Sequence, residues 1–359
     1  MIARADPARG DPPAARLRPA REPRTDPRAQ RLLVIDVERA SLDDRRIADL
    51  ASFVREGDVW ALNDAATLPA ALAGRAAGRH IELRLVGERV PGRWLAVLFG
   101  EGDWRDDTDL RPAPPVPSPG DRIELGGALS ARVERVDPRS PRLVEVSFSP
   151  EGDAFWRALY AIGRPVQYSY LARPMRLGEL QTPYAARPWS VELPSAGRPL
   201  TIELVRALRR AGAELVTLTH AAGLSATGDA ALDALLPLPE RYEIPERTAR
   251  AIERAKREGR RVVAVGTSTT RALEGSALAH GRVQAGIGET DLRLSARTER
   301  RVVDVLLTGA HDPSSSHYEL LRAFAPAELL ARAVRTSAEL GYLAHELGDS
   351  WLVLGAPAR

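Results

Sequence analysis

A stretch near the C-terminus restricts the possible folds of this chain more than any other segment. An apolar, β-branched run at residues 261–265 ends at Gly266, and hydroxyl residues followed by Arg271 open a helix-like pattern that continues to Glu274. This order is typical of α/β folds, where N–H groups at a strand-to-helix junction face a polar ligand. An ordinary turn capped by Ser and Thr is the alternative. The stretch lacks both Walker A and G-x-G-x-x-G sequences, which disfavours an NTPase or a dinucleotide oxidoreductase.

The first periodic segment indicates a β-α-β unit. Residues 31–36 and 59–62 are apolar runs typical of strands. Between them, the pattern predicts a helix over residues 41–54, opened by Ser41 with two aspartates in its first turn. Residues 1–30 lack periodicity and are dense in Pro, Arg and Asp, so we expect a flexible leader there.

The middle of the chain changes to short alternating runs. These are residues 80–86, 93–98, 122–125, 129–136 and 143–148. Pro and Gly between the runs predict a small antiparallel barrel or sandwich, with the Pro-rich residues 111–119 as an exposed loop. We therefore expect a mixed α/β main domain of residues 31–75 and 151–359, with a barrel-like domain inserted at residues 76–150.

Helix and strand patterns alternate again in the C-terminal half. The predicted helices are residues 201–211, 245–258 and 326–340, the last with Pro326 at its start and Gly341 at its end. The predicted strands are residues 214–218, 261–265 and 351–354.

Composition excludes several classes of chemistry. With 359 residues and 44% hydrophobic content, the chain is long enough for a substantial core, and its net charge of +3 demands no nucleic-acid partner. The absence of cysteine removes disulfides, thiolate nucleophiles and Cys-ligated metals. His311 and His317 do not have metal-ligand spacing, so no metal is expected. No apolar stretch suits a membrane span or signal peptide, and we expect a cytoplasmic monomer.

Two further motifs follow the Gly266 stretch in order. The first is the segment from Gly286 to Asp291, and the second is an apolar run from Val302 to Gly309 followed by His311. Together the three resemble the S-adenosylmethionine:tRNA ribosyltransferase-isomerase family of queuosine biosynthesis, which carries V-G-T-T-S-V-R-x-L-E, G-x-T-D-x-F and V-V-D-x-L-L-T-N-F-H in this order. A β-rich module inserted into an α/β domain is also the architecture that this resemblance implies.

Shorter segments match the family's motifs only in part. Asn63 and Asp64 fit the start of L-N-D-T-R, but Ala65 and Ala66 replace the Thr and Arg. The segment that corresponds to the family's H-K-M-H-x-E-x-Y lacks both histidines in this chain and keeps Glu240 and Tyr242. A further histidine, after Gly197, is absent, and His220 is displaced by one residue from the family's position, which in a strand turns it to the opposite face. Ala310 replaces the aromatic residue before His311, so a ring that could stack on a purine is gone.

The resemblance implies roles for the matched residues. The candidate catalytic residues are Asp64, Glu240, Asp291 and His311. The candidate substrate-binding residues are Asn63, Gln181, Thr182, Tyr184, Ser195, Gly197, Gly266, Thr267, Ser268, Thr269, Arg271, Glu274, Thr290 and Asp304. A local Asx turn is the alternative for the Asn63–Asp64 pair, and a buried structural carboxylate is the alternative for Asp304.

The implied reaction transfers the ribosyl part of S-adenosylmethionine, the co-substrate, to a 7-aminomethyl-7-deazaguanine in tRNA. It needs a base beside the sulfonium, a proton donor for departing adenine and exclusion of water. Because several histidines are missing, we interpret the chain as a divergent member whose acceptor can differ. A non-catalytic nucleoside- or RNA-binding paralogue is the rival. An unrelated α/β hydrolase or transferase ranks last, because the sequence shows no nucleophile–base pair. We expect Arg271, Asp291 and His311 to share one cleft.

Overall fold

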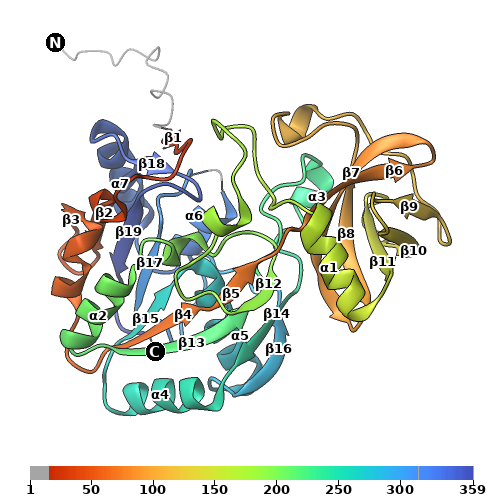
Figure 1. The fold of residues 1–359 in the computed structure, drawn as a ribbon. Coiled ribbons are helices and arrows are strands. Elements are labelled where there is room, and N and C mark those ends of the chain that lie inside the picture. Colours follow the sequence, from red (N-terminus) through yellow and green to blue (C-terminus); the bar gives the residue numbers. More distant parts are fainter. Residues whose placement is uncertain (1–15, 314, 359) are drawn as a thin grey trace, which may run out of the picture.

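A computed structural model describes residues 16–313 and 315–358 of the chain. They form a main α/β domain built on a nine-stranded sheet and a closed six-stranded barrel beside it (Figure 1). The chain leaves the sheet after β4 (Val59–Asn63), passes through β5 (Ala65–Thr67) and enters the barrel. It returns through β12 (Arg187–Ser190), which pairs with β5 in parallel. The barrel is therefore an insertion at one end of the central strand β4.

The main sheet is mixed, with a parallel centre. In spatial order its strands are β16 (Gly286–Thr290), β14 (Glu240–Ile244), β13 (Glu214–His220), β4, β15 (Val262–Val265), β17 (Val305–Gly309), β19 (Ser350–Leu354), β2 (Arg31–Asp36) and β3 (Ser41–Arg46). Strands β13, β4, β15 and β17 run parallel to one another, whereas β19 is antiparallel to β17. The carboxyl ends of four strands and the amino end of β19 thus meet at one edge of the sheet.

Two hydrophobic cores cover the two faces of this sheet. Along β4, Val59 and Ala61 belong to one core and Trp60 and Leu62 to the other, as expected for the period of two along a strand. The first core contains residues of α4 (Glu246–Arg257), α5 (Thr267–His280), α6 (Ser316–Leu321) and α7 (Ala327–Glu339). The second contains residues of α2 (Ile202–Arg210) and of the 3-10 helix η2 (Ile47–Phe53). The helices predicted at residues 201–211, 245–258 and 326–340 are confirmed as α2, α4 and α7.

The barrel is antiparallel and has its own core. Around the barrel, its strands are β10 (Ser130–Val136), β11 (Leu143–Ser149), β8 (Arg93–Phe99), β7 (Arg79–Val90), β6 (Ala71–Ala76) and β9 (Arg122–Glu124). Helix α1 (Gly152–Ile162) packs on it through Phe155, whose ring lies 5.7 Å from that of Trp94. The predicted fold class, a mixed α/β domain with an inserted barrel, is confirmed. The barrel begins at Ala71 rather than at residue 76, and α1 adds to its core.

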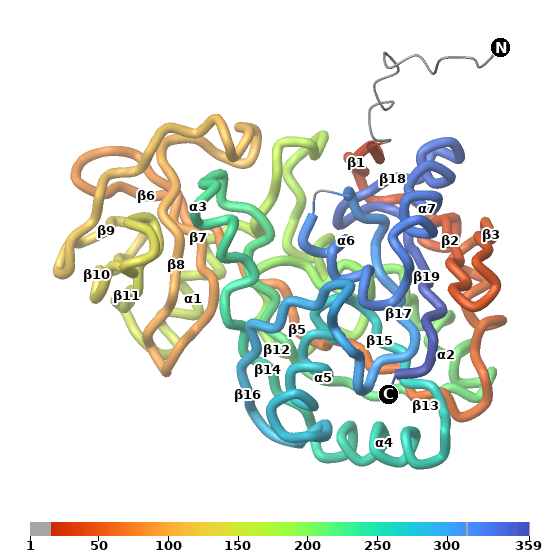
Figure 2. Tube along the Cα trace, turned by 180° about the vertical axis from the view of Figure 1, so that it is seen from behind, coloured from red at the N-terminus to blue at the C-terminus, as the bar shows by residue number. Residues whose placement is uncertain are grey.

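The remaining elements are short. They are β1 (Arg18–Pro19), β18 (Leu343–Ala344), α3 (Ala230–Asp233) and the 3-10 helices η1 (Pro27–Ala29), η3 (Thr108–Leu110), η4 (Leu177–Glu179) and η5 (Ser195–Gly197). Seen from behind, the barrel lies on the side of the main domain that carries β14 and β16, and β1 lies beside β18 (Figure 2). Among the described residues, none of the helices combines the length and apolar character that a bilayer span requires.

The predicted helix at residues 41–54 is wrong. Residues 41–46 form strand β3, which pairs with β2 in register from Ser41 opposite Asp36 to Arg46 opposite Arg31. The side chain of Asp44 accepts hydrogen bonds from Arg31 and from the Tyr342 hydroxyl. Pairing along a free sheet edge and these tertiary bonds override the local helix-start signal of Ser41, and only residues 47–53 wind into the 3-10 helix η2.

The expected leader of residues 1–30 is ordered in its second half. Residues 1–15 lie outside the described part, but Leu17 and Ala20 are buried and β1 pairs with β18. The guanidinium of Arg24 donates to both oxygens of the buried Asp349 carboxylate at 2.7 and 2.8 Å. This polar segment has too little apolar surface to order alone, and its contacts with the loop before β19 hold it.

Candidate functional site

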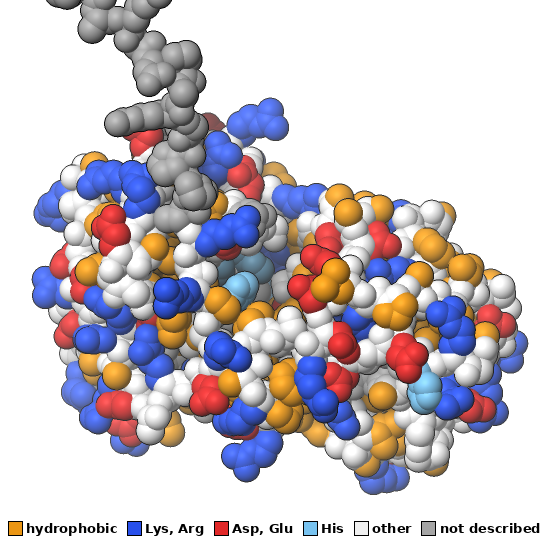
Figure 3. Space-filling view, turned by 90° about the horizontal axis from the view of Figure 1, so that it is seen from above, with side chains coloured by type: hydrophobic (Ala, Val, Ile, Leu, Met, Phe, Trp, Pro, Cys, Tyr) orange, Lys and Arg blue, Asp and Glu red, His pale blue; other side chains and the backbone are white. Residues whose placement is uncertain are grey.

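A cavity of about 440 Å³ opens at the edge of the sheet where the four parallel strands end. Residues that follow β13, β15 and β17 line it, together with the loop before β19 and segments near residues 168–170 and 192–196. The space-filling view shows a hollow with histidine side chains inside it (Figure 3). Ligands in α/β proteins bind at this edge, and the volume is in the ordinary range for a small-molecule site.

The junction of β15 and α5 forms part of the cavity wall. Gly266 has a φ of 99°, a backbone conformation that favours glycine, and its N–H donates to the carbonyl of Leu307 on β17. Helix α5 then begins at Thr267 without a capping side chain, and Thr267 and Ser268 line the cavity. Because the first N–H groups of a helix have no partner within it, this end can hold an anionic or polar ligand group.

Arg271 and Glu240 form an ion pair within the cavity wall. Arg271 lies in the second turn of α5, and Glu240 starts β14 on the far side of β13 and β4. Glu240 also accepts the N–H of Gly223 at 2.7 Å and lies 3.3 Å from Nε2 of His220. Burial lowers the pKa of Arg271 to about 10, so Arg271 is charged at neutral pH. The wall thus offers a carboxylate and a guanidinium side by side.

Two histidines stack on each other beyond the end of β17. His311 and His317, the latter on α6, have ring centroids 5.1 Å apart and an interplanar angle of 16°. The Nε2 of His311 lies 2.7 Å from the Thr308 hydroxyl. Burial and the neighbouring His317 and His345 hold the pKa of His311 well below its usual range, and burial and Arg271 lower the pKa of His317 to about 4. Both imidazoles are therefore neutral at pH 7 and able to accept a proton.

The loop before β19 brings two residues to the cavity that the sequence patterns did not single out. His345 stacks on Tyr170 with 4.6 Å between ring centroids, and the Tyr170 hydroxyl donates to the carboxylate of Glu346. All three line the cavity, as does Glu192, which accepts from the Tyr168 hydroxyl. No local motif marks these residues. Knowledge that β19 runs antiparallel to β17 would have predicted them, because this direction places the loop before β19 at the ligand-binding edge of the sheet.

Asn63 and Asp64 lie beneath the cavity rather than on its surface. The amide of Asn63 donates to the carbonyl of His220 at 3.0 Å and to the Ser268 hydroxyl at 3.3 Å, so it ties β4 to β13 and α5. Asp64 accepts the hydroxyl of Thr219 at 2.6 Å. Neither side chain is in the cavity wall, and both brace the strands that form it.

The segment from Gln181 to Gly197 contributes unevenly to the cavity. Gln181 makes two hydrogen bonds to the backbone of Thr67 on β5, at 2.9 and 3.0 Å. The Tyr184 hydroxyl packs directly against Gly197. Thr182 is buried beside the same glycine. Of the five predicted binding residues in this segment, Ser195 alone lines the cavity.

Asp291 does not join the expected cleft. It is exposed after the edge strand β16, and it is not in the cavity wall that contains Arg271 and His311. The expected convergence of three loops therefore holds for Arg271 and His311 only. The reason is the position of β16 at the outer edge of the sheet, separated from the parallel centre by β14. Its neighbour Thr290 packs closely against Gly275 of α5.

Three other candidates face the protein interior. The carboxylate of Glu274 accepts the N–H groups of residues 301, 302 and 303 at 2.8–3.1 Å. Asp304 accepts from the N–H groups of Val262 and Ala358 at the opposite edge of the sheet. The Thr269 hydroxyl donates to the carbonyl of Val265 within its own turn. These contacts match the structural alternative considered for Asp304 and extend it to Glu274.

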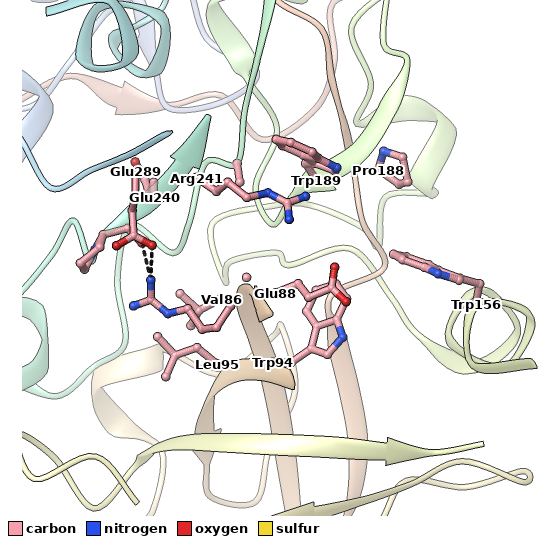
Figure 4. Close-up of a pocket in the computed structure, with 14 residues that line it drawn as sticks. Val86, Glu88, Trp94, Leu95, Trp156, Pro188, Trp189, Glu240, Arg241 and Glu289 are labelled. Carbon is pink, nitrogen blue, oxygen red and sulfur yellow. Dashed lines mark hydrogen bonds and ion pairs between the residues drawn. The ribbon is translucent and has the colours of Figure 1, made fainter. Parts of the chain in front are cut away.

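A second, smaller cavity of about 80 Å³ lies between the barrel and the main sheet (Figure 4). The three tryptophans Trp94, Trp156 and Trp189 line it. The guanidinium of Arg241 lies 3.6 Å from the centroid of the Trp189 ring. Glu240 lines both cavities, whereas its partner Arg271 lines the large one only. In the described part of the chain, no group of three or more His, Asp or Glu side chains has the arrangement of a metal site.

Fold and cavity together define an α/β protein with an inserted β-barrel and a polar, ligand-sized cavity at the carboxyl edge of its central strands. A sequence model described as queuosine biosynthesis protein matches residues 15–353. The chain belongs to this family.

Relatives and one solved structure agree with this membership. The S-adenosylmethionine:tRNA ribosyltransferase-isomerase of Thermus thermophilus is 36% identical over 320 residues, covering 86% of this chain and 88% of that protein. The protein of the same name from Syntrophotalea carbinolica is 34% identical over 342 residues, with 93% and 96% covered. A crystal structure of an S-adenosylmethionine tRNA ribosyltransferase from Thermotoga maritima matches with a TM-score of 0.52 at 24% identity, covering 96% of this chain and 98% of that chain. That likeness supports the fold.

Proposed function

We propose that this protein is an S-adenosylmethionine-dependent tRNA ribosyltransferase-isomerase. Family membership supports the proposal, and one observation about this chain carries it. Despite the missing histidines, a single cavity brings together the start of α5, the Arg271–Glu240 pair and neutral His311. These groups match a co-substrate that has a carboxylate, a positively charged sulfonium and an acidic C–H beside it.

The open end of α5 suits the methionyl carboxylate of S-adenosylmethionine. The N–H groups near Thr267 and Ser268 are the donors, and the positive end of the helix dipole favours the negative charge. Glu240 then supplies negative charge for the sulfonium within the same wall. The ion pair with Arg271 holds the Glu240 side chain in position.

His311 is the candidate base for the proton on C5′, the carbon next to the sulfonium. Its low pKa keeps the imidazole unprotonated, which is the form that a base needs to take up a proton. Stacking on His317 and the contact with Thr308 hold the ring in place. Of the four catalytic candidates, Glu240 and His311 line the cavity, and the proposal rests on these two.

The proposed acceptor is the 7-aminomethyl-7-deazaguanine of a tRNA, and the product is epoxyqueuosine. The aromatic second cavity beside Glu240 lies next to the reaction site, where bases adjacent to the acceptor would pass. Because S-adenosylmethionine and tRNA meet in the cytoplasm, the proposal places the protein there.

The test is one incubation of purified protein with S-adenosylmethionine and tRNA that carries the deazaguanine. Release of adenine and methionine, with a mass increase of the tRNA, supports the proposal. The same tRNA with guanine at that position is the control and should give no release. Tight binding of either substrate without turnover would instead support the non-catalytic rival, and turnover with a different acceptor would support divergence in substrate.

A further inference from the structure

Three aromatic rings form a column in one wall of the large cavity. Tyr168 and Tyr170 are stacked with 6.1 Å between centroids, and His345 continues the stack on Tyr170 at 4.6 Å. All three residues line the cavity, and His345, at the end of the column, is the exposed one. His345 has a φ of 67°, a conformation uncommon outside glycine and enriched at functional sites. The column offers a flat face to a planar ligand.

Glu346 lies at the edge of this column. It follows His345 in the chain, lines the cavity and accepts a hydrogen bond from the Tyr170 hydroxyl. Burial raises the pKa of Glu346 to about 7, so a large share of the side chain carries a proton at neutral pH. A carboxyl in this condition can donate a proton to a leaving group.

The other carboxyl of this wall is bonded differently. Glu192 accepts from the Tyr168 hydroxyl and from both the N–H and the hydroxyl of Ser225. Such donors hold a carboxyl group as an acceptor and tie it to the Ser225 loop. Burial raises the pKa of Glu192 as well, but the hydrogen bonds from Tyr168 and Ser225 oppose this shift and stabilise the carboxylate. Glu346 is therefore the better proton donor of the two.

We propose that the adenine of S-adenosylmethionine stacks on the His345 end of the column and that Glu346 donates the proton which adenine takes up as it leaves. This inference rests on the function proposed above. The bond between the ribose C1′ and the purine nitrogen breaks and its electron pair passes to the purine, while a lone pair of the ribose ring oxygen forms a C–O π bond to C1′. The Glu346 proton moves to a purine ring nitrogen, which leaves neutral adenine and a carboxylate. Solvent returns the proton to Glu346 before the next turnover.

The decisive experiment compares two leaving groups. Adenine release is measured with S-adenosylmethionine and with its 2-fluoroadenine analogue, whose electron-poor purine leaves more easily without a proton. We expect E346Q to slow release from S-adenosylmethionine by about 10²- to 10⁴-fold and release from the analogue much less. The matched control E192Q should slow both compounds by the same factor. Y170F, which removes the donor to Glu346, should show the leaving-group dependence of E346Q in weaker form.

Stacking is tested by binding. H345A should weaken S-adenosylmethionine binding about tenfold or more and leave the affinity for methionine unchanged. Equal slowing of both compounds by E346Q, with unchanged S-adenosylmethionine affinity and circular dichroism, would overturn the role of Glu346. Unchanged S-adenosylmethionine affinity in H345A would overturn the stacking. If the unmodified protein releases adenine from neither compound, the proposed function itself fails, which separates that outcome from a failure of Glu346 alone.

Discussion

The guanidinium of Arg271 and the carboxylate of Glu240 form an ion pair although the two residues are 31 positions apart in the chain and strands β13 and β4 lie between β14 and β15 in the sheet. Arg271 belongs to α5, which follows the central strand β15, whereas Glu240 begins β14 near the barrel side of the sheet. The pair therefore links the centre of the main domain to the boundary with the second cavity. Both side chains are largely buried, which makes each dependent on the other.

Removal of Arg271 should destabilise the protein as well as stop turnover. R271A leaves the Glu240 carboxylate buried without its cation, which costs about 3–5 kcal/mol in comparable pairs. R271K should recover part of the stability but little activity, because lysine cannot make the planar contact. The free energy of unfolding in urea measures the first effect, and adenine release measures the second.

The surface pair of Arg322 and Glu319 is the control for this change. Its atoms are 2.9 Å apart, but both side chains are at least 40% exposed, so R322A should change the free energy of unfolding by no more than about 0.5 kcal/mol. If R271A were as mild as R322A, the burial of the Arg271–Glu240 pair would not matter for stability.

His317 should make the protein sensitive to acid. Its pKa is about 4 in the folded protein and near 6.5 when unfolded, so below pH 6.5 the unfolded chain binds a proton that the folded protein excludes. The contribution of neutral His317 to the free energy of unfolding is complete above pH 6.5. It falls by about 3 kcal/mol as the pH falls towards 4. H317N should therefore flatten the dependence of unfolding free energy on pH between 6.5 and 4.

The exposed His280 provides the comparison for that experiment. H280N should leave the slope of unfolding free energy against pH as it is in the unmodified protein. The explanation fails if H317N has the same slope as H280N, since another group would then be responsible for the acid sensitivity.

Local sequence signals predicted those parts of the site that a single junction forms. Gly266 and the start of α5 are neighbours in the chain, so the change from β-branched to hydroxyl residues was enough to find them. The same reasoning failed at residues 41–54, because the free edge of β2 was available for pairing and a local pattern contains no information about it.

Contacts between distant segments were beyond prediction from patterns. Tyr170 and Glu346 are 176 positions apart, and only the return of the chain before β19 brings them together. Asp291 shows the converse, because its motif follows Arg271 closely in sequence while its strand lies at the outer edge of the sheet. Motif order identified the family correctly, but strand order decides which motif residues reach the cavity.

Asp349 should support both stability and ligand binding. Its carboxylate accepts from Arg24 and from the N–H groups of Arg31 and Leu343, the latter at the start of β18. D349A leaves these donors unpaired, and we expect a loss of about 2–4 kcal/mol in unfolding free energy. Because Leu343 begins the turn that carries His345, S-adenosylmethionine should also bind more weakly, which calorimetry measures.

R24A separates the two effects of Asp349. This substitution removes the cation but keeps the backbone hydrogen bonds of the turn, so it should cost about 1–2 kcal/mol and change the affinity for S-adenosylmethionine little. An equal loss of affinity in R24A and D349A would show that the N-terminal segment, and not the turn alone, shapes the cavity.

Gly197 should be required for packing rather than for ligand contact. A Cβ atom there would lie 1.9 Å from the Tyr184 hydroxyl and 3.0 Å from its ring carbon, so G197A should cost about 1–3 kcal/mol in unfolding free energy. Y184F removes the nearer atom, and the double variant should therefore be less destabilised than the sum of the single variants, by at least about 0.5 kcal/mol. G178A is the control, because a Cβ atom at Gly178 meets nothing within 4 Å. If the effects of G197A and Y184F were additive, the backbone would relieve the clash by shifting, and the contact with Tyr184 would not be what restricts residue 197 to glycine.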